Sequence, residues 1–209
     1  MVKIYTRKGD DGTTGLLYGG RVAKHAAPIE ANGAVDEAQA ALGVARAEAE
    51  PGSELDELLV HIERDLWVLM AEVATASDNR RKLVPERSLV TAAMVEALER
   101  RIDDLSEHFE MPTEFVVPGQ NRRSALLDVA RTVVRRAERL LAASPPADDS
   151  QVGAYLNRLS DLLWAAARWQ EGEDHLTARA GRRLVAGPDP AGAGAEPDPA
   201  GALSMEEET

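Results

Sequence analysis

Arginine side chains gather on the stretch NRRSALLDVARTVVRRAERLLA, where Arg131, Arg135 and Arg139 recur every fourth residue. On a helix this spacing stacks them along one side. We predict that the opposite side is apolar and consists of Leu126, Ala130, Val133, Ala137 and Leu140. Arginine suits phosphate because its planar guanidinium bonds two oxygens at once. The row is therefore a solvated face partly neutralised by Asp128 and Glu138, a polyanion site, or an acid-lined subunit contact.

A second segment that could bind an anion is TRKGDDGTTG at residues 6–15, with Lys24 just downstream. Glycines let backbone N–H groups approach an anion closely, and threonine hydroxyls donate further hydrogen bonds. The segment matches neither a Walker A loop nor a G-x-G-x-x-G turn after a strand. Turn formation is the alternative role of such a composition.

Asn157 and Asp161, within YLNRLSD, are four residues apart on a predicted helix. Asparagine is mildly unfavourable inside a helix because it competes for backbone hydrogen bonds, so it needs a partner. That partner is either another helix or a ligand. The chain has no cysteine, which excludes a thiolate nucleophile and a cysteine-ligated metal, and its four histidines lack metal-ligand spacing.

These residues must be positioned by helices, which the apolar periodicity predicts at residues 28–50, 54–77, 88–109, 122–143 and 151–170. Ser53 is a plausible N-cap of the second helix. Residues 1–24 have no helical period, residues 79–87 read as a polar loop, and residues 115–119 as a short extended segment closed by a turn. Five helices with short links predict an all-α bundle.

The 209-residue chain has a formal net charge of −12, half of which lies in residues 187–209. This Pro/Gly/Ala-rich tail has six acids and no Lys or Arg, so we expect it to be disordered beyond a domain at residues 1–186. The acidic balance argues against nucleic acid and anionic membranes, and the basic loop at 80–82 lacks interleaved aromatics. Without a signal-peptide pattern or a long apolar run, we expect a cytoplasmic protein.

Together these segments resemble the PduO-type ATP:cob(I)alamin adenosyltransferases, also called corrinoid adenosyltransferases. The matching stretches appear in the family's order over roughly residues 4–170: TRKGDDGTTGL with Lys24, VDEAQAALG, FVVPG followed by ALLDVARTVVRRAER, and YLNRLSDLLW. The chain departs from the common pattern at Lys8, often Thr or Asn, at Gln120, often Gly, and at Asp128, often His.

The resemblance implies a homotrimer of ferritin-like, up-and-down five-helix bundles that binds ATP between neighbouring subunits. It implies that the triphosphate is held by Thr6, Arg7, Lys8, Gly9, Thr14, Gly15 and Lys24. It implies that the adjacent subunit completes the ATP site with Arg135, Arg136, Ala137, Glu138, Arg139 and Asn157. Arg131 would pair with Asp36 across the interface and act with Arg135 in catalysis. Phe115 would lie against the lower face of the corrin.

The implied reaction transfers the 5′-deoxyadenosyl group of ATP to the Co(I) of a corrinoid such as cob(I)alamin, giving adenosylcobalamin and triphosphate. Co(I) is itself the nucleophile, so the protein needs no Cys, Ser or His for that purpose. Mg²⁺ would be bound through the ATP phosphates rather than by side chains. The alternative is a non-catalytic bundle that binds ATP or adenosylcobalamin and delivers the cofactor to a mutase. A flavoprotein reductase and an adenosylcobalamin-dependent mutase are the further partners implied.

Overall fold

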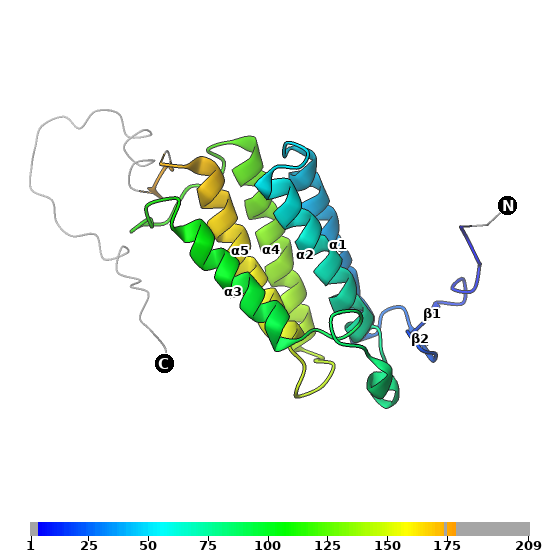
Figure 1. Cartoon of the computed structure of the whole chain (residues 1–209). Coiled ribbons are helices and arrows are strands. Elements are labelled where there is room, and N and C mark those ends of the chain that lie inside the picture. The colour runs from blue at the N-terminus through cyan, green and yellow to red at the C-terminus, as the bar shows by residue number, and fades with distance from the viewer. Residues whose placement is uncertain (1–3, 174, 179–209) are drawn as a thin grey trace, which may run out of the picture.

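The computed structural model describes residues 4–173 and 175–178, and this part of the chain is mostly helical (Figure 1). Its elements in chain order are β1 (Thr13–Gly15), β2 (Arg21–Ala23), α1 (Ala27–Ala47), α2 (Glu54–Val73), the 3₁₀ helix η1 (Ser77–Lys82), α3 (Ala92–Ser106), α4 (Arg122–Ala142) and α5 (Val152–Glu171). The five predicted helices are therefore confirmed, with ends that differ by a few residues. The predicted tail, residues 187–209, lies outside the described residues.

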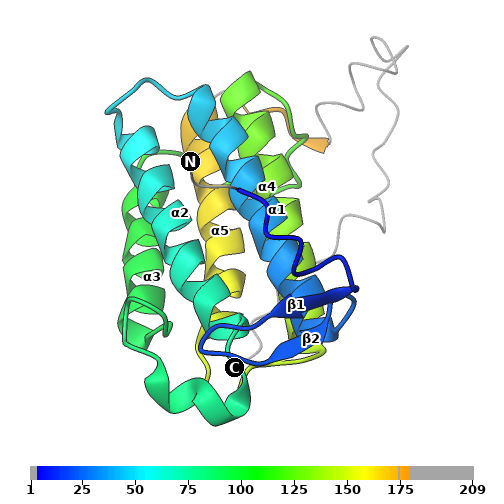
Figure 2. The same cartoon turned by 90° about the vertical axis from the view of Figure 1, so that its right-hand side faces the viewer.

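The five α-helices lie side by side and alternate in direction (Figures 1 and 2). α1 packs against α2 and α4, and α5 packs against α4 and α3. Leucine, valine, isoleucine and alanine side chains from all five helices form one continuous core. None of the described helices is both long and apolar enough to cross a membrane. α4 thus has neighbours on two sides, and this decides which of its side chains are buried.

Polar side chains fix where the helices begin. The predicted N-cap Ser53 accepts a hydrogen bond from the backbone N–H of Asp56 at 3.3 Å. Thr91 caps α3 in the same way. α4 begins with a reciprocal capping box, in which Asn121 and Ser124 each bond the other's backbone N–H. Each cap satisfies an N–H group that the helix cannot pair internally.

The predicted apolar stripe of α4 is wrong by one residue at three of its five positions. The buried apolar residues are Leu127, Ala130, Val134, Ala137 and Leu141. Leu126 and Val133 are only partly buried, and Leu140 is 38% exposed. The sequence has apolar pairs seven residues apart, so two adjacent stripes have the same helical period. Contact with both α1 and α5 selects the second member of each pair.

The N-terminal region also differs from the all-α prediction, because β1 and β2 form an antiparallel hairpin. The hairpin is attached to the end of α2 by a hydrogen bond from the N–H of Leu17 to the carbonyl of Ala74, at 2.8 Å. The predicted extended segment is confirmed: Val116 pairs with Thr177 in an antiparallel bridge. The loop predicted at residues 79–87 overlaps the 3₁₀ helix η1, which begins at Ser77 and ends at Lys82.

A buried carboxylate joins the connections at the hairpin end of the bundle. Glu72, on α2, is fully buried and accepts hydrogen bonds from Arg80 at 2.8 Å, from the N–H of Val90 at 2.8 Å and from the hydroxyl of Ser150 at 2.7 Å. These donors come from η1, from the loop before α3 and from the loop before α5. One charged group therefore holds two points of the α2–α3 connection and one point of the α4–α5 connection.

Glu72→Gln should destabilise the fold strongly, because it leaves the Arg80 cation without its buried partner. We expect a loss of about 3 kcal/mol in the free energy of unfolding, measured by urea titration. The control is Glu96→Gln, which alters an exposed carboxylate on α3 and should cost about 0.5 kcal/mol or less. Equal losses in the two variants would contradict a central role for Glu72.

Candidate functional site

The arginines of α4 divide into two groups. Arg135 and Arg139 are exposed, and Nη1 of Arg139 donates to the backbone carbonyl of Arg135 at 3.0 Å. Arg136 points the other way and forms an ion pair with Glu37 of α1. The cations of Arg135 and Arg139 are thus presented together, whereas that of Arg136 is partly neutralised within the chain. Ala137, implied to contact ATP, is fully buried in the core.

Arg131 continues this row and is bound by Asp128 of the same helix. Its Nε donates to Oδ1 of Asp128 at 2.9 Å, and a quarter of its side chain is exposed. Asp36, the partner implied across a subunit interface, is exposed on α1. The described residues contain no ion pair between Arg131 and Asp36, so their pairing between subunits stays a prediction.

Asn157 makes the helix–helix contact that was one of its two predicted roles. Its Nδ2 donates to Oε1 of Glu138 on α4 at 3.1 Å, and its Oδ1 accepts from Nη1 of Arg158 at 2.7 Å. This contact places Asn157 beside the arginine row. Burial raises the pKa of the nearby Asp161 carboxyl, which the cations of Arg158 and Arg135 oppose.

The N-terminal arm, residues 4–12, leads into the hairpin and brings Gly9 against Lys24. A Cβ atom on Gly9 would lie only 3.2 Å from Cε and Nζ of Lys24 and from the carbonyl of Thr13. The absence of a side chain at this position is what lets the ammonium group reach the loop. Thr14 and Gly15, both in β1, pair with Val22 and Arg21 of β2.

Arg21 braces the arm, although the sequence did not single it out. Its guanidinium donates to the hydroxyl of Thr13 and to the carbonyl of Lys8. Lys8 also donates its backbone N–H to the hydroxyl of Thr6 at 3.4 Å. Arg7 has φ of 61°, in the left-handed region that non-glycine residues rarely adopt. The arm projects from the α1 side of the bundle, away from α4 (Figures 1 and 2).

Phe115 is 75% exposed, so it is not a core residue. It lies in the connection between α3 and α4, where its carbonyl accepts from the N–H of Ala178 at 2.8 Å. Met111 and Val117 in the same connection are also exposed. Exposed apolar side chains in one loop are suited to contact a flat apolar ligand surface.

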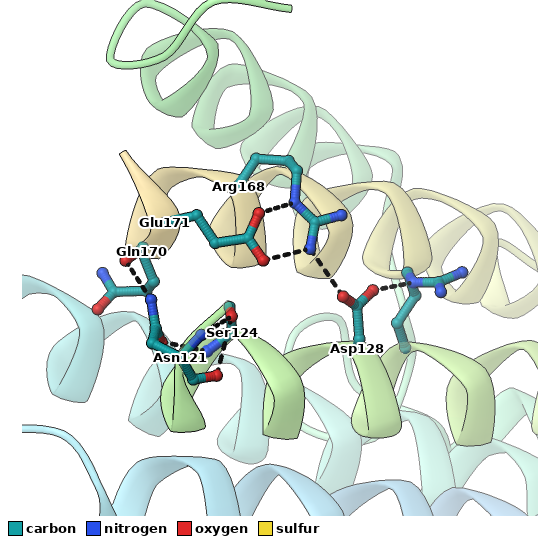
Figure 3. A network of polar contacts seen from close by, with 7 residues as sticks. Asn121, Ser124, Asp128, Arg168, Gln170 and Glu171 are labelled. Carbon is teal, nitrogen blue, oxygen red and sulfur yellow. Dashed lines mark hydrogen bonds and ion pairs between the residues drawn. The ribbon is translucent and has the colours of Figure 1, made fainter. Parts of the chain in front are cut away.

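Asp128, Arg168 and Glu171 are charged residues that the sequence did not single out as a buried cluster. Nη2 of Arg168 donates to Oδ2 of Asp128 at 2.7 Å and to Oε1 of Glu171 at 3.0 Å (Figure 3). No signal in the sequence singles out Asp128, because it has neither a three- nor a four-residue spacing from Leu127, Ala130 or Val134. Asp128, read from the sequence as a surface charge, is instead buried.

Among the described residues, this site offers cations and backbone donors but no nucleophile paired with a base. An exposed arginine pair and a glycine-containing arm with a lysine can bind a polyphosphate. An exposed aromatic loop can bind an apolar face. Among the described residues, no group of three or more His, Cys, Asp or Glu side chains could hold a metal ion.

The sequence profile of the cobalamin adenosyltransferases matches residues 4–170, so the chain belongs to the cobalamin adenosyltransferase family. This confirms the resemblance and the expected enzyme class. A corrinoid adenosyltransferase of Mycobacterium tuberculosis is 41% identical over 172 residues, which cover 80% of this chain and 88% of the relative. One of Citrobacter freundii is 39% identical over 175 residues, covering 82% of this chain and 96% of the relative.

The fold is similar to that of a variant PduO-type ATP:corrinoid adenosyltransferase from Lactobacillus reuteri complexed with cobalamin and ATP. The TM-score is 0.74 at 28% identity, and the match covers 84% of this chain and 97% of the other. A second variant of that protein, complexed with ATP, gives a TM-score of 0.71 at 27% identity, covering 80% and 94% of the two chains.

Asp161→Asn should stabilise the protein more at neutral pH than in acid. A carboxyl whose folded pKa is raised binds more protons in the folded than in the unfolded state, so its contribution to stability falls as pH rises through that window. The gain of the variant over wild type in urea unfolding should therefore be larger at about pH 7.5 than at about pH 3.5. A gain that does not vary with pH would contradict the raised pKa.

Proposed function

We propose that this chain transfers the 5′-deoxyadenosyl group of ATP to the Co(I) of a corrinoid, giving adenosylcobalamin and triphosphate. The observation that carries the proposal is the pair of cationic elements: the exposed arginines of α4 and the Gly9–Lys24 arm. The electron pair of Co(I) forms the cobalt–carbon bond to C5′. The C5′–O bond breaks, and its electrons leave with the triphosphate.

The role of the protein in this reaction is to bind, orient and stabilise charge. Negative charge builds on the leaving triphosphate, and cations that are already in place lower the barrier to its departure. We assign Lys24, Arg7, Lys8 and the backbone of the arm to the triphosphate, together with Thr6, Gly9, Thr14 and Gly15. Arg135 and Arg139 contact it from the other side, and Asn157 and Glu138 line the same site.

Phe115 is assigned to the lower face of the corrin. Its ring is exposed in a loop with two other apolar side chains, so it can cover the cobalt from below without a change of the core. An apolar surface there excludes water and an axial base, which leaves Co(I) open for attack on C5′.

Mg²⁺ is assigned to the phosphate oxygens of ATP. Magnesium is commonly bound through substrate phosphates and few or no carboxylates, which fits described residues that offer no cluster of metal-binding side chains. When bound, it would neutralise part of the triphosphate charge.

The active unit is proposed to be a homotrimer with α1 and α4 at the subunit contact. Val44 of α1 and Val129 of α4 are each 54% exposed, and Leu140 is 38% exposed. The ion pairs of Glu37 with Arg136 and of Glu48 with Arg122 show that α1 and α4 are antiparallel. This arrangement brings Val44, Val129 and Leu140 onto one surface. The arm projects away from its own bundle and is placed to reach a neighbouring α4. Asp36, exposed on α1, is then available to Arg131 of another subunit.

A reductase, proposed to be a flavoprotein, would supply the Co(I) substrate, and an adenosylcobalamin-dependent mutase would use the product. We place both steps in the cytoplasm. A chain without cysteine needs no disulfide, which is compatible with a reducing compartment.

The reaction is tested by mixing the protein with ATP, Mg²⁺ and chemically reduced cob(I)alamin and following the loss of the Co(I) absorbance. Formation of adenosylcobalamin above the protein-free control is expected. ATP binding without turnover would instead favour the non-catalytic binder.

Arg135→Ala should lower kcat/KM by about a hundredfold or more, because an interaction with the developing charge is lost. The melting temperature should change little, since Arg135 is exposed. Arg100→Ala, which removes an exposed arginine of α3, is the matched control and should retain activity. A near-normal kcat/KM for Arg135→Ala would contradict the assigned role.

A site shared between subunits should show complementation. Lys24→Ala and Arg135→Ala are each expected to be inactive as homo-oligomers. Mixed oligomers made by co-expression should recover about a quarter of wild-type activity, because one site in four combines an intact arm with an intact α4. The sedimentation mass should be three times the 22.5 kDa of the chain. No recovery in mixed oligomers would place the whole site within one chain.

A further inference from the structure

Four charged side chains meet where α4 packs on α5. Three of them, Asp128, Arg168 and Glu171, are labelled in Figure 3. Arg168 is 1% exposed, Asp128 4% and Glu171 7%, so three of the four are buried. Arg131 is the fourth and the only one of the four that reaches the surface. Two carboxylates and two guanidinium groups balance, which a buried cluster requires because an unpaired buried charge is very unfavourable.

Both oxygens of Asp128 are used, and each serves a different arginine. Oδ2 accepts from Nη2 of Arg168 at 2.7 Å, and Oδ1 accepts from Nε of Arg131 at 2.9 Å. Arg168 is itself fixed by Glu171, whose Oε2 lies 2.8 Å from its Nε, and by the ring of Trp164 at 5.5 Å. The carboxylate that contacts Arg131 therefore cannot turn freely.

The helix ends beside this cluster are also tied together. Nδ2 of Asn121, the N-cap of α4, donates to the carbonyl of Gln170 near the end of α5 at 2.8 Å (Figure 3). This contact holds α4 and α5 in register. Arg131 donates to Asp128 through its Nε. The two amino groups at the outer edge of its guanidinium are not used in that contact.

We propose that Asp128 is a positioning residue for Arg131. Backed by the buried Arg168–Glu171 pair, Asp128 fixes the Arg131 guanidinium toward the side of α4 that carries Arg135 and Arg139. The inference rests on the function proposed above and on the catalytic role that the family resemblance implies for Arg131. A flexible arginine would have to be ordered during each turnover. An arginine held from behind by a buried carboxylate is already oriented.

The test compares Asp128→Asn with Glu171→Gln. Each removes one negative charge from the same buried cluster and keeps the side-chain shape, so both should lower the melting temperature by similar amounts. Only Asp128 touches Arg131. We expect Asp128→Asn to lower kcat about tenfold or more with KM for ATP within about twofold of wild type. Glu171→Gln should lower kcat by less than about twofold, because the amide oxygen still accepts from Arg168 and the contact of Asp128 with Arg131 is intact.

If the kcat of Asp128→Asn is less than about fivefold lower than the kcat of Glu171→Gln, the proposal is overturned, because the cluster would then act only on stability. If Asp128→Asn does not fold, Asp128→Glu keeps the charge but displaces the carboxylate, and the same ratio applies. Absence of turnover in the wild-type protein would instead refute the proposed function, so the two failures are distinguishable.

A double-mutant cycle gives a second, independent readout. If Asp128 acts through Arg131, adding Asp128→Asn to Arg131→Ala should lower the residual kcat no further. A full additional loss in the Arg131→Ala background would show that Asp128 acts by another route and would overturn the proposal.

Discussion

The packing of α4 between α1 and α5 is the constraint on which the rest of the molecule depends. Leu127, Val134 and Leu141 face the core, and this rotation turns Arg131, Arg135 and Arg139 to one side of the helix and Arg136 to the other. A rotation of α4 by one residue, about 100°, would change which of these side chains face α1 and which face α5. Which arginines α4 exposes together is therefore a consequence of which of its apolar residues are buried against α1 and α5.

Charge in this protein has to be considered locally. The net charge of −12 disfavours polyanions at long range, yet half of it lies in residues 187–209. Around α4 the cations are distributed by their partners: Glu37 neutralises Arg136, whereas Arg135 and Arg139 stay exposed. Interactions between exposed charges are screened within about 8 Å at physiological ionic strength. A small anionic substrate thus responds to the arginines beside it more than to the net charge of the whole chain.

Much of the fold was predictable because helical periodicity and caps are local properties. The five helices, the N-cap Ser53 and the extended segment around Val116 followed from the sequence. The β1–β2 hairpin did not, because strands of three residues carry too little alternation to be recognised. The position of the buried stripe of α4 also did not, since paired leucines and valines allow two stripes and only the neighbouring helices choose between them.

The sequence by itself determined the spacing of the arginines, the composition of the arm and the motifs that identify the family, because each depends on residues close together in the chain. Only the tertiary structure decided that Asp128 is buried between Arg131 and Arg168, that Lys24 packs on Gly9 and that Phe115 is exposed. The physical reason is that burial and ion pairing depend on side chains brought together from distant positions. Asp128 and Arg168 are 40 residues apart, and no local pattern could have joined them.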